Sequence, residues 1–143
     1  HIPVFGNGDV DGCINGLKTA RSIALLSYRT YQAYAKSQIE ITNENVCDFR
    51  AASYQRYQGT KLATRFNAYS YLCLLNMMDS HNVARGRESI SKALARVKAN
   101  TLVVSISSDQ LFPVGEQRTL VNGIENAVFA TIDSEYGHDG FLI

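Results

Sequence analysis

The spacing of apolar residues predicts that the first part of the chain is helical. Apolar side chains recur at intervals of three and four residues over 17–26 and again over 67–78, which is typical of amphipathic helices. Asn15 and Asn67 precede these two segments and are predicted to cap them. The helical character extends to about residue 83, where the pattern changes.

Weaker patterns lie between and before these two helices. The stretch 1–16 is rich in glycine and acidic residues and is expected to be a loop. A short helix is expected over 31–36, and polar residues near Thr42 are expected to open another. The pattern over 47–58 is only loosely helical, and Gly59 is expected to interrupt it.

The second part of the chain alternates between helical and strand-like patterns. The run Thr101–Ile106 is short, β-branched and apolar, which predicts a strand buried on both faces. In order, the expected elements are a helix over 88–97, this strand, a helix over 115–124, a strand over 127–132 and a glycine-rich turn over 135–140. A strand, a helix and a strand at this spacing predict a βαβ unit with a parallel pair. The chain is therefore assigned to the α/β class, with a helical region over 1–83 and an α/β region over 84–143.

Composition adds mainly exclusions. The 143 residues contain 14 Lys plus Arg and 13 Asp plus Glu, so the formal net charge is +1. Because the basic residues are spread along the chain, nucleic acid and anionic membranes are poor candidates for partners. No apolar run approaches the roughly 18 residues that a membrane span needs. Three cysteines without a CxxC pair are expected to be thiols in a reducing compartment.

A metal site is not predicted. Residues 7–12 match the first half of a calcium-binding EF-hand loop, but Lys18 stands where the bidentate Glu belongs. The glycines of the same stretch also lack the third glycine of a dinucleotide-binding fingerprint. The histidines and cysteines show no metal-ligand spacing.

Candidate chemistry lies after the two predicted strands. Asp109 follows the first strand and His138 follows the second, 29 residues later. Carboxyl ends of parallel strands gather reactive groups, so these two can form a pair in which the carboxylate holds one ring nitrogen and the other acts as a base. On spacing alone, a turn-capping Asp109 and a plain loop His138 remain an equal alternative. The order Asp then His is also that of an α/β-hydrolase after its nucleophile.

The serine that such a pair would serve is missing from the chain. Glycines four residues apart surround Val10 and Ile14, so no G-x-S-x-G turn is present. The chain begins at His1 and ends on the apolar run Phe141–Ile143. We therefore expect it to be part of a longer protein, with the nucleophile upstream.

Several segments, in the same order, resemble the homoserine O-acetyltransferase family. They are ARSIALLSYR at 20–29, YQRYQGTKLATRFNAYSYL at 54–72, TLVVSISSDQLFP at 101–113 and YGHDGFLI at 136–143. The resemblance corresponds to the C-terminal part of the family. It implies that 1–83 form a helical lid and that 84–143 form the last parallel strands and helices of an α/β-hydrolase fold.

The resemblance also implies a reaction and roles for five residues. Members of the family move acetyl from acetyl-CoA to the hydroxyl of L-homoserine by a ping-pong Ser-His-Asp mechanism in methionine biosynthesis. Asp109 and His138 would be the acid and base of the triad, Asp139 would face the ammonium of the substrate, and Arg21 and Tyr28 would reach the same pocket from the lid. A solvated Arg21 and a core Tyr28 are the alternatives.

Further expectations follow from the same resemblance. Acetyl-CoA would be a co-substrate with no permanently bound cofactor, and the N-terminal remainder of the protein would complete the site. The protein would be cytoplasmic and a homodimer through its lid helices. Asn67 and Tyr69 depart from the usual residues of the family, so succinyl-CoA as donor or serine as acceptor stays open, as does an esterase of the same fold. The helical region is rich in Tyr, Leu and Met, so a role mainly in protein association is a further alternative.

Overall fold

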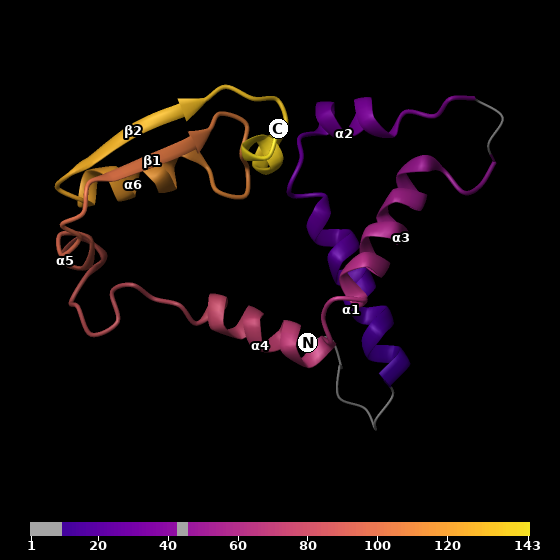
Figure 1. Ribbon diagram of the computed structural model, residues 1–143, viewed down its shortest axis with the longest axis horizontal. Coiled ribbons are helices and arrows are strands. Elements are labelled where there is room, and N and C mark those ends of the chain that lie inside the picture. Colours follow the sequence, from indigo (N-terminus) through magenta and orange to yellow (C-terminus); the bar gives the residue numbers. More distant parts are fainter. Residues whose placement is uncertain (1–9, 43–45) are drawn as a thin grey trace. The chain divides into compact units, whose positions relative to one another are not determined.

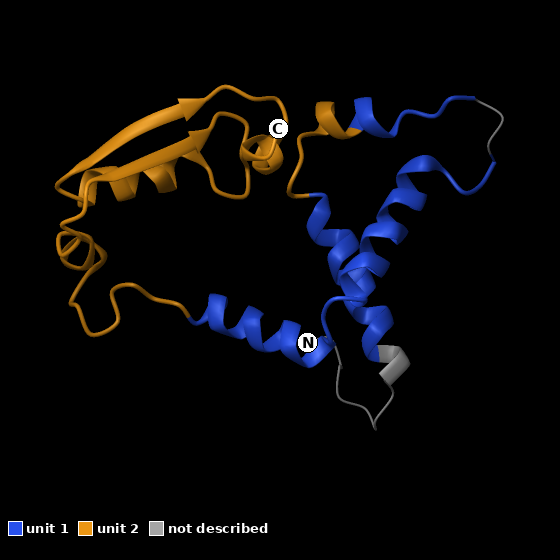
Figure 2. Ribbon diagram, in the orientation of Figure 1, with its two compact units in different colours: residues 1–26, 35–80 blue, residues 27–34, 81–143 orange. Residues whose placement is uncertain are grey.

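The computed structural model describes residues 10–42 and 46–143. It divides the chain into two compact units, of which unit 1 comprises residues 1–26 and 35–80 and unit 2 comprises 27–34 and 81–143 (Figure 2). The main boundary lies at residues 80 and 81, and unit 2 also takes a short segment from the helical region. The interpretation of the two regions as a lid and a core stays a prediction.

Unit 1 is built on the packing of helix α1 (Val10–Leu25) against helix α3 (Arg50–Ala63) (Figure 1). Helix α1 begins earlier than expected, so the loop prediction is wrong for residues 10–16 and Asn15 lies inside the helix. The sequence explains this, because Val10, Ile14 and Leu17 continue the helical spacing toward the N-terminus. Residues 1–9 of the expected loop lie outside the described part of the chain.

Helix α3 runs through Gly59, which was expected to interrupt it. The glycine is buried, and a Cβ atom at this position would lie 2.7 Å from the carbonyl oxygen of Lys18 in α1. Gly59 therefore allows the two helices to approach closely. The hydroxyl of Ser22 adds a hydrogen bond across the same contact, to the carbonyl oxygen of Gln55 at 3.1 Å. The prediction of a helix opening near Thr42 is wrong, because α3 begins at Arg50.

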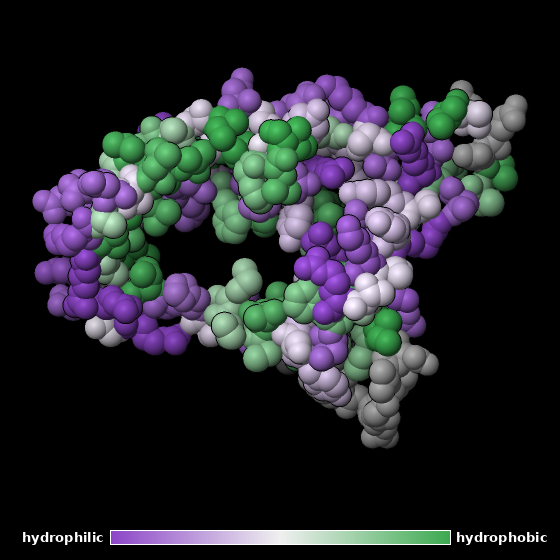
Figure 3. Space-filling model, in the orientation of Figure 1, coloured by the Kyte–Doolittle hydropathy of each residue, from purple (hydrophilic) through white to green (hydrophobic). Residues whose placement is uncertain are grey.

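Two other helices confirm the predicted pattern. Helix α2 (Tyr31–Gln38) begins in unit 2 and ends in unit 1. Helix α4 (Ala68–Asp79) is capped as predicted, with the Asn67 side chain accepting a hydrogen bond from the Ser70 N–H at 2.8 Å. None of the α4 residues is buried, and apolar side chains gather over this helix in Figure 3.

Unit 2 contains the predicted βαβ unit. Strands β1 (Thr101–Ile106) and β2 (Ala127–Ile132) pair in parallel, and helix α6 (Val114–Gly123) connects them and packs on both. The expected helix over 88–97 is shorter, with α5 spanning Ile90–Leu94 after an N-cap at Ser89. The expected terminal turn is a 3₁₀ helix, η1 (Gly137–Phe141).

Strand β1 is buried along one face and largely exposed on the other, which corrects the prediction of burial on both. Val103 and Ser105 are buried, whereas on the opposite face Leu102 and Val104 are 63% and 41% exposed, and Ile106 at the strand end is buried. The alternation fits a sheet that has α6 on one side, because successive side chains of a strand point to opposite faces. The apolar side chains left exposed lie over the two strands in Figure 3.

Among the described residues, no helix is both long and apolar enough to span a bilayer.

Candidate active site

The register of the sheet brings Asp109 and His138 together. Ile106 and Ile132 are paired, so the two parallel strands end at the same level. Asp109 lies three residues beyond the end of β1 and His138 six residues beyond the end of β2. The Oδ2 atom of Asp109 lies 2.9 Å from Nδ1 of His138, which is hydrogen-bond distance.

The surroundings of Asp109 stabilise its charged form. The side chain is 7% exposed, and Oδ1 accepts hydrogen bonds from the N–H groups of Leu111 and Phe112 at 2.8 and 2.9 Å. Burial by itself would raise the pKa of this carboxyl, but the Phe112 N–H, the contact with His138 and the Leu111 N–H together outweigh it and lower the pKa. Asp109 is therefore an ionised acceptor at neutral pH.

An ionised Asp109 fixes the tautomer of a neutral His138. Because the carboxylate can only accept, Nδ1 of the imidazole carries the proton and Nε2 carries the lone pair. Within the described part of the chain, Nε2 has no hydrogen-bond partner. The rings of Tyr28, Phe112 and Phe141 surround the imidazole, with centroids 5.5, 5.2 and 5.4 Å away. The ring is thus held by apolar surfaces with its basic nitrogen available.

Serine hydroxyls join the loops that carry the pair. The Ser107 hydroxyl donates to Oδ1 of Asp133 at 2.8 Å and accepts from the Ser134 N–H at 3.2 Å. The Ser108 hydroxyl donates to the carbonyl oxygen of Ser134 at 2.5 Å and accepts from the Gly137 N–H at 2.9 Å. The sequence pattern alone does not single out these two serines, although they directly precede Asp109.

The short turn at residues 28–30 packs on the histidine loop. The Asp139 N–H donates to the carbonyl oxygen of Tyr28 at 3.0 Å, and the Thr30 hydroxyl donates to that of Glu135 at 2.5 Å. Gly137 has a positive φ of 67°, and a Cβ atom there would lie 3.0 Å from the same Tyr28 oxygen. Glycine is therefore needed at this position both for its backbone conformation and for its size.

Asp139 forms an ion pair that the sequence did not suggest. Its Oδ2 atom accepts from Nε of Arg29 at 2.8 Å, and the carboxylate side chain is 15% exposed. No described residue forms a hydrogen bond to Oδ1 of Asp139. Arg29 directly follows Tyr28, so a neighbour of a predicted site residue supplies this contact.

The structure therefore brings four of the five predicted site residues into one unit. Asp109, His138, Tyr28 and Asp139 all lie in unit 2. The ring of Tyr28 lies against that of His138, and Asp139 directly follows His138 in the sequence. Arg21 lies in α1 of unit 1 and is partly exposed. The predicted role of Arg21 stays a prediction.

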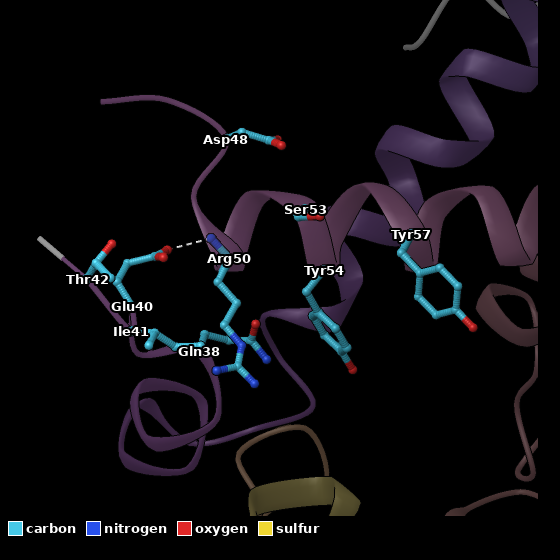
Figure 4. Close-up of a pocket in the computed structure, with 9 residues that line it drawn as sticks. All are labelled: Gln38, Glu40, Ile41, Thr42, Asp48, Arg50, Ser53, Tyr54 and Tyr57. Carbon is cyan, nitrogen blue, oxygen red and sulfur yellow. Dashed lines mark hydrogen bonds between the residues drawn. The ribbon is translucent and has the colours of Figure 1, made fainter. Parts of the chain in front are cut away.

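A separate pocket in unit 1 lies between the end of α2 and the start of α3 (Figure 4). Its charged groups are engaged with neighbours, since Glu40 accepts from the Arg50 N–H and Asp48 pairs with Arg56. No histidine or cysteine lines it. Across the described residues, no group of three His, Cys, Asp or Glu side chains is arranged to hold a metal ion. Residues 7–9 of the EF-hand-like stretch lie outside that range.

Comparison with known proteins identifies relatives of this chain. It is 44% identical over 128 residues to the homoserine O-acetyltransferase of Cyclobacterium marinum, covering 90% of the chain and 36% of that protein. It is 42% identical to the homoserine O-acetyltransferase of Clavibacter michiganensis, covering 97% of the chain and 38% of the relative. The chain thus spans little more than a third of the length of these curated relatives. No family model matches it.

Solved structures that resemble this chain include a homoserine O-acetyltransferase and an esterase. The homoserine O-acetyltransferase of Staphylococcus aureus superposes with a TM-score of 0.68 at 30% identity, covering 92% of this chain and 38% of that one. Esterase E22 superposes with a TM-score of 0.72 at 17% identity, covering 88% of this chain and 38% of that one, which shows the fold alone.

The parallel strand pair, with a carboxylate and a histidine beyond its carboxyl ends, is the C-terminal portion of an α/β-hydrolase fold. The predicted fold class is confirmed. Within this fold, the sequence relatives of the chain are homoserine O-acetyltransferases, which are transferases, and the predicted resemblance is confirmed.

Proposed function

We propose that the protein containing this chain transfers acetyl from acetyl-CoA to the hydroxyl of L-homoserine, and that this chain supplies the acid and base of its triad. The observation that carries the proposal is the 2.9 Å contact between the buried, ionised Asp109 and Nδ1 of His138, with Nε2 left available. The choice of substrates is supported by the sequence relatives, which are homoserine O-acetyltransferases.

The proposed reaction has two half-reactions with one base. In the first, Nε2 of His138 takes the proton of a serine hydroxyl in the rest of the protein. The serine oxygen then forms an ester with the acetyl carbon, and CoA leaves with the proton from the imidazolium. In the second, Nε2 takes the proton of the homoserine hydroxyl, whose oxygen takes over the acetyl group. The serine oxygen regains a proton, and Asp109 stabilises the imidazolium in both halves.

The same loop offers a site for the amino acid. Oδ2 of Asp139 is held by Arg29, so Oδ1 can accept a hydrogen bond from the substrate ammonium. Tyr28 lies against His138 and would border the same space. Arg21 is proposed to bind the substrate carboxylate as a two-pronged donor. Succinyl-CoA as donor and serine as acceptor remain the alternatives within this class.

A hydrolase is the second candidate, because the fold also matches esterase E22. The triad would be shared, and water would replace homoserine as the acceptor. The aromatic rings around His138 favour transfer, since an acyl-enzyme that passes its acyl group to an alcohol must exclude water.

The test uses the purified full-length protein with acetyl-CoA, with and without L-homoserine. We expect release of CoA thiol that depends on homoserine, with O-acetylhomoserine detected by mass spectrometry. The His138→Ala variant should abolish release, whereas His81→Ala, at an exposed histidine of the same unit, should not change it. Acetyl transfer that persists in His138→Ala would refute the assignment. Ester hydrolysis without CoA release would favour the esterase.

Three further properties rest on the family resemblance. We propose that the protein has no permanently bound cofactor, is cytoplasmic, and forms a homodimer through its lid helices. The exposed apolar side chains of α4, Leu74, Leu75, Met77 and Met78, support the dimer because the described residues leave 39% to 69% of each of these residues exposed. Light scattering that gives a monomer at micromolar concentration would exclude the dimer.

A further inference from the structure

The side chain of Ser108 connects the two loops that carry the acid and the base. We propose that Ser108 is a positioning residue, whose hydroxyl sets the distance between Asp109 and His138. The inference rests on the part of the proposed function that assigns acid-base catalysis to this pair. It does not depend on which molecule accepts the acyl group.

The position of Ser108 continues the pairing of the strands. The last main-chain bond of the parallel pair runs from the Ser107 N–H to the carbonyl oxygen of Ile132 at 3.0 Å. Beyond it the loops differ in length, so main-chain pairing cannot continue. The Ser108 hydroxyl provides the next link between the two chain segments, because it accepts a hydrogen bond from the Gly137 N–H and donates one to the Ser134 carbonyl oxygen.

This link lies directly beside the catalytic contact. Ser108 precedes Asp109, and Gly137 precedes His138, so the two side-chain bridges join consecutive residues of both loops. A shift of Gly137 relative to Ser108 would move His138 relative to Asp109 by a similar amount. The bridge between Ser108 and Gly137 therefore determines whether the 2.9 Å contact of the pair forms.

Burial makes the hydroxyl difficult to replace. Gly137 is buried, and its positive φ fixes the direction of its N–H. Without the hydroxyl this N–H would lose its acceptor, and a buried donor without an acceptor is unfavourable. The loop would then move to find another partner. Neighbouring Ser107 differs in that it is exposed and bonds to Asp133 and to the Ser134 N–H, and not to the residue next to His138.

Loss of the bridge should act on the chemical step more than on substrate binding. Rates of proton transfer depend steeply on the alignment of the groups involved, and a misplacement of about 1 Å can cost about 100-fold. We expect Ser108→Ala to lower kcat by about 10- to 100-fold. The KM for homoserine should change less than about two-fold, because Asp139 is held independently of Ser108 by its N–H bond to the Tyr28 carbonyl oxygen and by its ion pair with Arg29.

The experiment compares variants in the full-length protein by two assays. Acetyl transfer to homoserine and hydrolysis of p-nitrophenyl acetate are measured for wild type, Ser108→Ala, Ser108→Thr and Thr119→Ala. Ser108→Thr keeps the hydroxyl and should recover most of kcat. Thr119→Ala removes an exposed hydroxyl of α6, bonded only to the Gly115 carbonyl oxygen within its helix, and is the matched control. Thermal melts show which variants are folded.

The outcomes separate this inference from the proposed function. A kcat for Ser108→Ala within two-fold of wild type in both assays would overturn the inference and leave the proposed function intact. A slow Ser108→Ala in ester hydrolysis, with no acetyl transfer by wild type, would support the inference and refute the proposed function. If Ser108→Ala does not fold, Ser108→Cys takes its place, because the thiol fills similar space but is a weak hydrogen-bonding group. A Cys variant as fast as wild type would then overturn the inference.

Discussion

Replacement of Gly137 by alanine tests how closely the turn at 28–30 packs on the histidine loop. The residue has two properties that an alanine cannot share. Its φ is +67°, and an added Cβ would lie 3.0 Å from the Tyr28 oxygen and 3.1 Å from the Thr30 nitrogen. Both neighbours are backbone atoms, so they cannot move aside as the end of a flexible side chain would.

The loss of stability expected for Gly137→Ala is the sum of two contributions. A left-handed backbone conformation costs a residue other than glycine about 1–2 kcal/mol. Overpacking against fixed atoms costs about 1–3 kcal/mol. Gly137→Ala should therefore lower the free energy of unfolding by roughly 2–5 kcal/mol, with the smaller value expected if the turn at 28–30 moves by a few tenths of an ångström.

Two other glycines of unit 2 separate the contributions. Gly86 has a φ of +69° with no atom within 4 Å of its Cβ position, so Gly86→Ala measures the backbone cost alone. Gly115 lies in α6 with ordinary φ and open space, so Gly115→Ala should stabilise by roughly 0.5–1 kcal/mol through helix propensity.

The assay is urea unfolding of the full-length variants, combined with ester hydrolysis in the folded range. Gly137→Ala should be clearly less stable than Gly86→Ala and should also lose activity, because its strain falls next to His138. Equal stability of these two variants would refute the close approach of the turn at 28–30.

Three further predictions concern Asp109 and the packing of α1. Asp109→Asn should lower kcat about 10⁴-fold with little change in KM, since an amide can hold the wrong tautomer of the histidine. Because the pKa of Asp109 is lowered on folding, its stabilisation is present above the ordinary value of about 3.9 and is lost as pH falls through the folded value. The stability difference between wild type and Asp109→Asn, measured by urea unfolding, should therefore shrink as pH falls from about 5 to 3, and a constant difference would contradict the shift. Gly59→Ala should lower the free energy of unfolding, measured by urea unfolding, by at least about 1–3 kcal/mol, because the added Cβ would lie 2.7 Å from the Lys18 carbonyl oxygen. Gly16→Ala, where an added Cβ meets open space, should be neutral or stabilising in the same urea unfolding. Equal changes in stability for the two variants would refute the close contact between α1 and α3.

The sequence was most informative where a pattern is local. The strands at 101–106 and 127–132 and the helix between them matched their apolar runs, because each run has one period and clear ends. The N-cap at Asn67 could be predicted from its side chain and position. Asp109 and His138 could be predicted as a pair because parallel strands end at one edge.

The sequence misled where a tertiary contact overrides local preference. A glycine in a loosely helical pattern predicts a break, but the small size of Gly59 allows the close contact between α1 and α3. The apolar run of β1 predicts burial on both faces, but such a run reports hydrophobicity and not which elements cover the strand. The pairing of Arg29 with Asp139 joins residues 110 positions apart, and no local pattern indicates such a contact.

The register of the two strands also shows where the chain can change length. The positions of Asp109 and His138 are counted from the paired ends Ile106 and Ile132, three residues in one loop and six in the other. Residues added between α6 and β2 would leave both counts unchanged and could be absorbed at the far end of the sheet. A single residue added within 107–108 or 133–137 would displace one partner from the other. In distant relatives, the separation of acid and base along the sequence is therefore free to vary, while their distances from the strand ends are not.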